Sequence, residues 1–104
     1  MPSPNITQTL SANGAKVILG VSDLDSVAVQ VTGTFTATLE FEVSLDGRTF
    51  VSLSMTPSSS TTTATNTTTT GVWMADIPGV VNFQVRVSSY TSGGAVVTIQ
   101  GQGE

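Results

Sequence analysis

The sequence predicts an all-β fold, an antiparallel β-sandwich of about eight strands with a jelly-roll or immunoglobulin-like arrangement. Residues 35–45 alternate apolar and polar side chains with a period of two, which is typical of a half-buried strand. Turn-forming pairs such as Asn13-Gly14, Asp46-Gly47 and Pro78-Gly79 separate the apolar segments. No segment has the spacing of an amphipathic helix. Short strands separated by such turns indicate a sandwich or barrel.

The first third of the chain predicts an arm and three strands. Pro2 and Pro4 favour an extended arm over residues 1–5, followed by a weak strand over residues 6–10. Asn13-Gly14 predicts a hairpin turn into a strand over residues 16–21. A polar loop over residues 22–26 precedes a valine-rich strand over residues 27–31, and Gly33 permits the reversal that follows.

Residues 35–45 form the central strand of this prediction. One face is apolar (Phe35, Ala37, Leu39, Phe41, Val43 and Leu45), and the other is polar (Thr36, Thr38, Glu40, Glu42 and Ser44). After Asp46-Gly47, a return strand is expected over residues 48–55. A two-residue loop would place Phe50, Ser52 and Ser54 on the Leu45 face, whereas a three-residue loop with a glycine bulge would place Val51, Leu53 and Met55 there. The second alternative is preferred because it buries three apolar side chains.

The second half of the chain predicts a low-complexity insertion and three more strands. Residues 56–70 are rich in threonine and serine, and we expect an exposed loop or protruding ribbon that is mobile at its tip. Strands are predicted over residues 73–77, 81–88 and 95–100, with a loop over residues 90–94 and a fraying tail over residues 101–104. Two packed sheets would then bury the Phe35 face against the Val81 face.

Composition limits the class of function. A chain of 104 residues predicts a single domain, and the absence of cysteine and histidine removes thiol nucleophiles and the commonest general base. Three basic residues and a net charge of −4 argue against nucleic acid and anionic membranes as partners. No apolar run is long enough for a membrane span, and the first residues do not resemble a secretory signal. Eighteen threonines and thirteen serines instead give an uncharged surface suited to contact with other subunits.

Two blocks of sequence resemble a family of small bacteriophage virion proteins. The first block combines Val31-Thr32-Gly33-Thr34-Phe35, Leu39-Glu40-Phe41-Glu42, Ser44-Leu45-Asp46-Gly47 and Phe50-Val51; the second runs from Phe83 to Gly93. This pattern, over roughly residues 15–101, is similar to β-sandwich or jelly-roll domains that decorate phage capsids or sit in necks, fibres and tails. The resemblance transfers no functional residue, and the threonine-rich segment departs from the pattern as a local insertion.

Several acidic residues are candidates for catalytic or metal-binding groups. Glu40 and Glu42 share a strand face, as two carboxylates of a glycosidase could, but a solvated strand face is the preferred interpretation. Asp23 and Asp25 could offer oxygen ligands to calcium, yet an ordinary loop explains them better. Asp46-Gly47 is interpreted as a turn. We therefore predict no catalytic, cofactor-binding or metal-binding residue, and no enzyme activity.

Three side chains are the candidates for partner binding. Trp73 could stack on a sugar, but its alternation with Ala75 and Ile77 favours the core or an interface. Tyr90 is expected to anchor a loop through its hydroxyl group. Arg86 could pair with Glu40 or Glu42, or with a partner subunit. Asn5 and Asn66 match the glycosylation sequon, but modification is not expected.

The sequence thus favours a non-enzymatic structural protein of the virion, made in the host cytoplasm. We expect a capsid decoration or auxiliary protein that binds the capsid exterior through the major capsid protein or other virion subunits. Edge strands would add to a neighbour, and a homotrimer is compatible with the sequence. The alternative is a carbohydrate- or receptor-binding module of a phage fibre, neck or tail, with the threonine-rich loop and Trp73 near the ligand.

Overall fold

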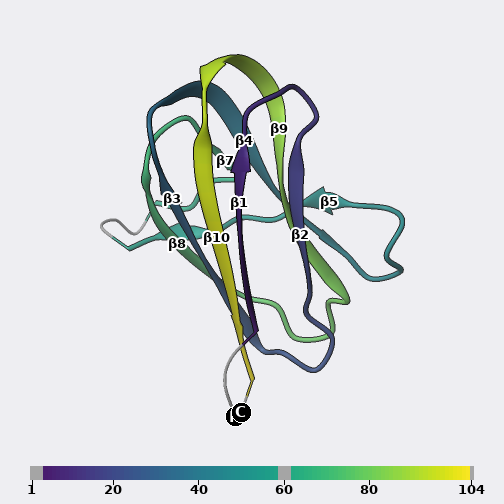
Figure 1. Ribbon diagram of the computed structural model, residues 1–104. Helices are drawn as coiled ribbons and strands as arrows, with labels where there is room; N and C mark the ends of the chain where they lie inside the picture. The colour runs from purple at the N-terminus through teal and green to yellow at the C-terminus, as the bar shows by residue number, and fades with distance from the viewer. Residues whose placement is uncertain (1–3, 59–61, 104) are drawn as a thin grey trace.

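The computed structural model describes residues 4–58 and 62–103, which form ten strands in two antiparallel sheets packed as a sandwich (Figure 1). Sheet A has the order β1 (Asn5–Leu10), β10 (Ala95–Gln102), β3 (Ser26–Thr32), β8 (Gly71–Asp76) and β6 (Thr56–Pro57). Sheet B has the order β2 (Lys16–Gly20), β9 (Asn82–Gly93), β4 (Phe35–Ser44) and β5 (Val51–Ser52), and β7 (Asn66–Thr67) also pairs with β4. No helix occurs within the described ranges. The predicted all-β sandwich is confirmed.

The core lies between the two sheets and follows the predicted alternation. Val27, Val29 and Val31 of β3 point inward from sheet A, and Phe83 and Val85 of β9 point inward from sheet B. Across the interior, the rings of Phe41 and Trp73 lie 5.6 Å apart between centroids, with their planes tilted by 48°. Each fully buried aliphatic or aromatic side chain contributes about 1.5–3 kcal/mol of transfer free energy, so this layer is the main source of stability.

The expectation that the Phe35 face packs against the Val81 face is wrong. β4 and β9 are neighbours in sheet B, where Phe41 pairs with Val85 and Val43 pairs with Phe83. Both strands therefore present their apolar faces to the same side, toward sheet A. A period of two identifies which side chains point inward, but it does not say which strands hydrogen-bond to each other.

Two adjacent strand pairs pass together from one sheet to the other at a common corner. The β3–β10 pair of sheet A continues into the β4–β9 pair of sheet B through Gly33 and through Gly93-Gly94 (Figure 1). Gly33 has φ of 96°, which confirms the predicted reversal, and the Gly94 N–H donates to the Thr34 carbonyl at 3.0 Å. The predicted loop over residues 90–94 is wrong, because β9 stays paired with β4 as far as Gly93.

The Asn13-Gly14 turn connects different sheets and is not the predicted hairpin. Gly14 has φ of 78°, as such a turn requires, and its N–H donates to the Val87 carbonyl at 3.0 Å. β1 pairs with β10, however, while β2 pairs with β9. The two strands that this turn joins are therefore edge strands of opposite layers.

The segment after β4 differs most from the predicted hairpin. Val43 pairs with Val51 and β4 ends at Ser44, so residues 45–50 form the connection and neither proposed loop length is right. The preferred facing is confirmed at Met55, which is fully buried. Leu45 and Val51 remain 72% and 59% exposed, because sheet B ends there and nothing described covers them. The expected long return strand is reduced to β5.

The threonine-rich segment is not a free loop over its described part. β6 pairs with β8 of sheet A, β7 pairs with β4 of sheet B, and Met55 bridges to Ala64. The Phe41 N–H donates to the Thr65 carbonyl at 2.9 Å, which ties the segment to the central strand. The part expected to be a mobile tip includes residues 59–61, which lie outside the described residues.

Both chain ends are more ordered than the sequence suggested. Asn5, assigned to the arm, begins β1 and pairs with Gln100. Gly101 and Gln102, assigned to a fraying tail, belong to β10 and pair with Val27 and Ser26. The rest of the predicted arm before Pro4, and Glu104 of the tail, lie outside the described residues.

Candidate functional site

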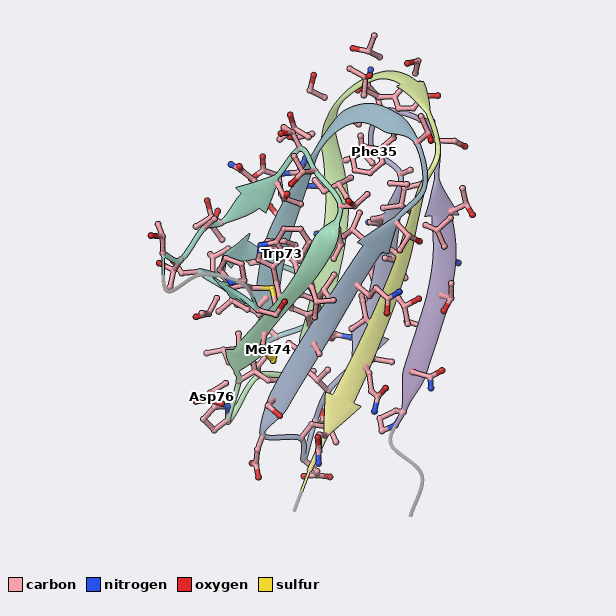
Figure 2. All side chains as sticks on the ribbon, turned by 90° about the vertical axis from the view of Figure 1, so that its left-hand side faces the viewer. Phe35, Trp73, Met74 and Asp76 are labelled. Atoms are coloured by element: carbon pink, nitrogen blue, oxygen red, sulfur yellow. The ribbon has the colours of Figure 1, made fainter. Side chains whose placement is uncertain are left out.

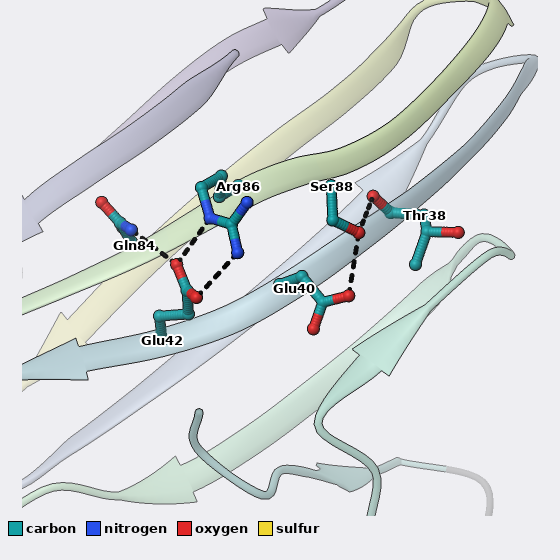
Figure 3. A network of polar contacts seen from close by, with 6 residues as sticks. All are labelled: Thr38, Glu40, Glu42, Gln84, Arg86 and Ser88. Carbon is teal, nitrogen blue, oxygen red and sulfur yellow. Dashed lines mark hydrogen bonds and ion pairs between the residues drawn. The ribbon is translucent and has the colours of Figure 1, made fainter. Parts of the chain in front are cut away.

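A polar network crosses the outer face of sheet B, where β4 and β9 run side by side (Figure 3). Arg86 donates from Nε to Glu42 Oε1 at 2.9 Å and from its terminal nitrogen Nη2 to Glu42 Oε2 at 3.0 Å. Gln84 donates from Nε2 to the same Oε1 at 2.7 Å. Two residues along, the Ser88 hydroxyl donates to Glu40 Oε2 at 2.9 Å. The alternating polar positions of two neighbouring strands bring all these groups onto one face.

Glu42 is the electrostatic centre of this network. The hydrogen bonds from the Arg86 guanidinium hold the pKa of the Glu42 carboxyl below its ordinary value of 4.5; burial opposes this shift, and the Gln84 amide adds to it. The same pair raises the pKa of Arg86. Glu42 is 9% exposed, so the prediction of a solvated strand face is wrong for this residue.

The arrangement does not give Glu40 and Glu42 the properties of a glycosidase pair. A general acid needs a carboxyl whose pKa is raised by an apolar environment. The pKa of Glu42 is shifted in the opposite direction, and both of its oxygens already accept hydrogen bonds from Arg86. The geometry is that of a charge-assisted structural clamp between two strands.

The three candidate partner-binding residues lie in different places. Arg86 pairs with Glu42 of its own chain, which selects Glu42 over Glu40, and a contact of Arg86 with a partner subunit stays a prediction. The Tyr90 hydroxyl donates to the Gly93 carbonyl at 2.8 Å, as expected for an anchor at the corner. Trp73 is buried to 6% exposure against Phe41, so its ring has little surface to offer a partner (Figure 2). The fold does not gather these residues into one site.

The threonine-rich segment nevertheless forms a hollow beside Trp73. This open cavity of about 330 Å³ is lined by hydroxyl and amide side chains, by apolar side chains and by Trp73; the polar ones are Ser58, Asn66, Thr67, Thr69 and Thr70, and the apolar ones include Pro57, Ala64 and Val72. Gly71 lies directly against that ring, since a Cβ atom at Gly71 would sit 3.0 Å from Trp73. The sequence analysis expected Trp73 and the threonine-rich segment to lie near each other only in the alternative of a carbohydrate-binding module.

The other acidic candidates serve turns. Asp46 Oδ1 accepts from the Thr49 and Arg48 N–H groups and from the Ser44 hydroxyl, and these bonds lower the pKa of Asp46 below 3.8. Asp23 adopts a positive φ of 70° in the loop before β3. No cluster of three or more metal-ligating side chains occurs in the part of the chain that the structure describes. Asp46-Gly47 is confirmed as a turn stabilised by side-chain to backbone bonds.

A depression on the outer face of sheet A was not anticipated from the sequence. It has a volume of about 280 Å³ and lies where β3, β8 and β10 meet, with Ala28, Met74 and Gln100 among its lining residues. Met74 is 46% exposed there, whereas its neighbour Trp73 on the same strand points inward (Figure 2). The alternation of β8 could have identified Met74 as an outward apolar residue, but not the strands beside it.

Gln84 is a second feature that the sequence did not single out. It is 3% exposed, and its Oε1 has no hydrogen-bond partner among the described residues. Its Nε2 is committed to Glu42, which fixes the orientation of the amide. Gln84 thus positions the Glu42 carboxylate from the side opposite to solvent-facing Arg86.

Comparisons with known proteins identify the fold. No protein-family model matches the sequence, and no curated protein matches it. The solved structure of the SPBc2 prophage-derived protein YomS matches 98% of this chain and 96% of its own, with a TM-score of 0.77 and 19% identity. The PBSX exported protein XepA matches 93% of this chain with a TM-score of 0.77 and 20% identity, and this chain spans 38% of its length. At these identities the likeness establishes a common fold.

No helix in the described residues is long and apolar enough to cross a membrane.

Proposed function

We propose that this chain is a non-enzymatic structural protein of a bacteriophage particle, which attaches to other virion subunits. The observation that carries the proposal is the end-to-end match with YomS, a protein described as prophage-derived, over 98% of this chain and 96% of that one. The virion-protein resemblance of residues 31–51 and 83–93 supports the same conclusion from the sequence. Within the particle, we assign it to the capsid exterior as a decoration protein that contacts the major capsid protein.

The outer face of sheet A is the surface best suited to this attachment. β1, β3 and β10 contain no charged residue, and the one charged residue that lines the depression is Asp76 at the end of β8, so docking of this face would desolvate few ionic groups. Met74 supplies an exposed apolar side chain at the depression formed with Ala28 and Gln100. Ser26, Gln102 and the carboxylate of Asp76 also line the depression, and an apolar centre with a polar rim is the usual anatomy of a protein interface. Repetition over a symmetric shell multiplies weak contacts by avidity.

Binding to capsid shells that lack this protein tests the proposal. Purified chain should co-sediment with such shells, and Met74→Lys should abolish or strongly reduce binding by burying a charge at the depression. Thr36→Lys is the matched control, because Thr36 is exposed on sheet B and its substitution should leave binding unchanged. Absence of wild-type binding to shells and to every other purified virion component would overturn the proposal.

The hollow beside Trp73 favours a second candidate, recognition of a neutral carbohydrate. Hydroxyl and amide side chains beside an aromatic residue are the groups that such ligands use. Trp73→Ala is a poor test, since Trp73 is part of the core. Asn66→Ala is better because Asn66 lines the hollow and is exposed, with Asn5→Ala as a control remote from the hollow. Glycan-array binding lost only in Asn66→Ala would support this candidate, and silence of the wild type would remove it.

A further inference from the structure

β1 is the least protected strand edge in the described part of the molecule. The other outer edges are short, charged or bulged: β5, β6 and β7 have two residues each, β6 includes Pro57, and β2 carries Lys16. The parts of β4 and β9 that extend beyond β7 and β2 pair with each other through two irregularities in register. β1 has six residues, with no charge, no proline and no bulge in its register with β10. Short length, charges, prolines and bulges are the devices by which natural sheets prevent edge-to-edge pairing. Because β1 has none of these features, its edge is available for pairing with a further strand.

The register of β1 identifies which backbone groups are free. The Gly101 N–H donates to the Pro4 carbonyl at 2.9 Å, and in an antiparallel ladder every second pair exchanges hydrogen bonds. Ile6, Gln8 and Leu10 are therefore bonded to β10. Asn5, Thr7 and Thr9 direct their N–H and C=O groups away from it, toward the open edge.

The side chains along this edge suit a second copy of the same chain. The chain carries a net charge of −4, so copies repel each other wherever their carboxylates meet. β1 and the two strands that follow it in sheet A, β10 and β3, carry no charge. On their outer face the hydroxyls of Thr7 and Thr98 share a hydrogen bond of 2.9 Å. Approach at β1 thus brings together strands without carboxylates, and the nearest charged strand is β2 of the other layer, which carries Lys16.

We infer that two copies associate through antiparallel pairing of β1 with β1 of the second copy, about a two-fold axis at Thr7. Thr7 pairs with Thr7 of the copy, and Asn5 pairs with Thr9, each pair exchanging two N–H···O bonds. Gln8 of one copy then lies across from Ile6 of the other and covers this half-buried side chain. Sheet A becomes continuous across the dimer. This inference does not depend on the proposed attachment to a capsid.

Sedimentation of wild type and two Thr7 variants tests the pairing. Wild type should show twice the chain mass of 10.7 kDa. Thr7→Pro removes an N–H that points away from β10, which edge strands tolerate, so the fold should persist by circular dichroism. Its dimer dissociation constant should rise at least about tenfold. Thr7→Val, which keeps the N–H and loses only the hydroxyl, should remain a dimer.

Complementary charges test the two-fold axis itself. Thr7→Lys and Thr7→Glu should each be monomeric, because like charges would lie opposite each other, and an equimolar mixture should form a heterodimer. Met74→Lys, on β8 of the same sheet, should stay dimeric even if it loses binding to capsid shells, so the two proposals fail separately. A monomeric wild type, a trimer, or a dimer unaffected by Thr7→Pro and Thr7→Lys would overturn the inference.

Discussion

Protonation of Glu42 would remove the charged hydrogen bonds between its carboxylate and Arg86 and so lower the stability of the fold. Its folded-state pKa lies below the ordinary value of 4.5, so its ionised form stabilises the fold above that value and the contribution disappears as the pH falls through the folded-state pKa. The free energy of unfolding, measured in urea, should therefore be level near neutral pH and decline below about 4.5. Asp46, whose pKa lies below 3.8, adds a further decline at lower pH.

Glu42→Gln should weaken the decline in unfolding free energy that begins below about pH 4.5. At neutral pH it should cost about 1–2 kcal/mol, since Arg86 loses its charged acceptor while remaining 38% exposed to water. Glu40→Gln makes the same chemical change two residues away, where the acid accepts a bond from Ser88, and should cost less. Equal losses of stability in the two variants would contradict the role assigned to Glu42.

Gly93 is required at the corner for two separable reasons. It has φ of 85°, and a Cβ atom at this position would overlap the Thr34 carbonyl oxygen and crowd Phe35. Gly79 also has φ of 85°, but a Cβ atom there would meet nothing. Gly79→Ala should cost about 1–2 kcal/mol from the backbone conformation alone. Gly93→Ala should cost clearly more stability. Thermal unfolding of the two variants measures this difference, and equal losses would contradict the predicted overlap of the Cβ atom at Gly93.

Met55 is one of several residues that attach the threonine-rich segment to the body of the protein. Met55 is fully buried and bridges to Ala64, so Met55→Ala should leave a cavity and cost about 2–5 kcal/mol. The same substitution at Met74, which is 46% exposed, should change stability by less than about 0.5 kcal/mol. Hydrogen exchange should also show faster exchange of the Phe41 amide in Met55→Ala, because its acceptor is the Thr65 carbonyl.

The sequence predicted individual strands better than their partners. The alternation of residues 27–31, 35–43 and 81–87 correctly identified β3, β4 and β9 and their buried faces. The same pattern could not show that β4 and β9 share a sheet, because side-chain period is a local property and pairing is not. β6 and β7 were missed because two-residue strands of threonine, asparagine and proline have no apolar period.

The candidate site was predictable only in its parts. Arg86 and the two glutamates were recognised as possible partners, but the strand register alone does not select Glu42: Arg86 lies directly opposite Glu40 and reaches diagonally to Glu42, which lies opposite Gln84. Trp73 was recognised as a core or interface side chain from its alternation, and Tyr90 as an anchor from its place at the end of a predicted strand. The Met74 depression needs β3, β8 and β10 together, which lie far apart in sequence.

The two sheets are built as one unit by strands that continue from one layer into the other. β3 and β10 pass into β4 and β9 at a shared corner, and the segment from Met55 to Trp73 crosses between the layers as well. The first strand, β1, pairs with the last strand, β10, and is the outermost strand of sheet A. Neither layer can therefore keep its register while the other unfolds.

This continuity predicts cooperative unfolding of the whole chain. Trp73 is the only tryptophan, and it packs from sheet A against Phe41 of sheet B, so its fluorescence reports contact between the layers. Far-ultraviolet circular dichroism reports the strands of both layers. Urea transitions followed by the two signals should coincide, with one midpoint and one slope. Separate midpoints would mean that one sheet persists without the other and would contradict the structural unity inferred from the shared corner. Because the pairings join distant parts of the chain, refolding should take milliseconds to seconds by stopped-flow fluorescence.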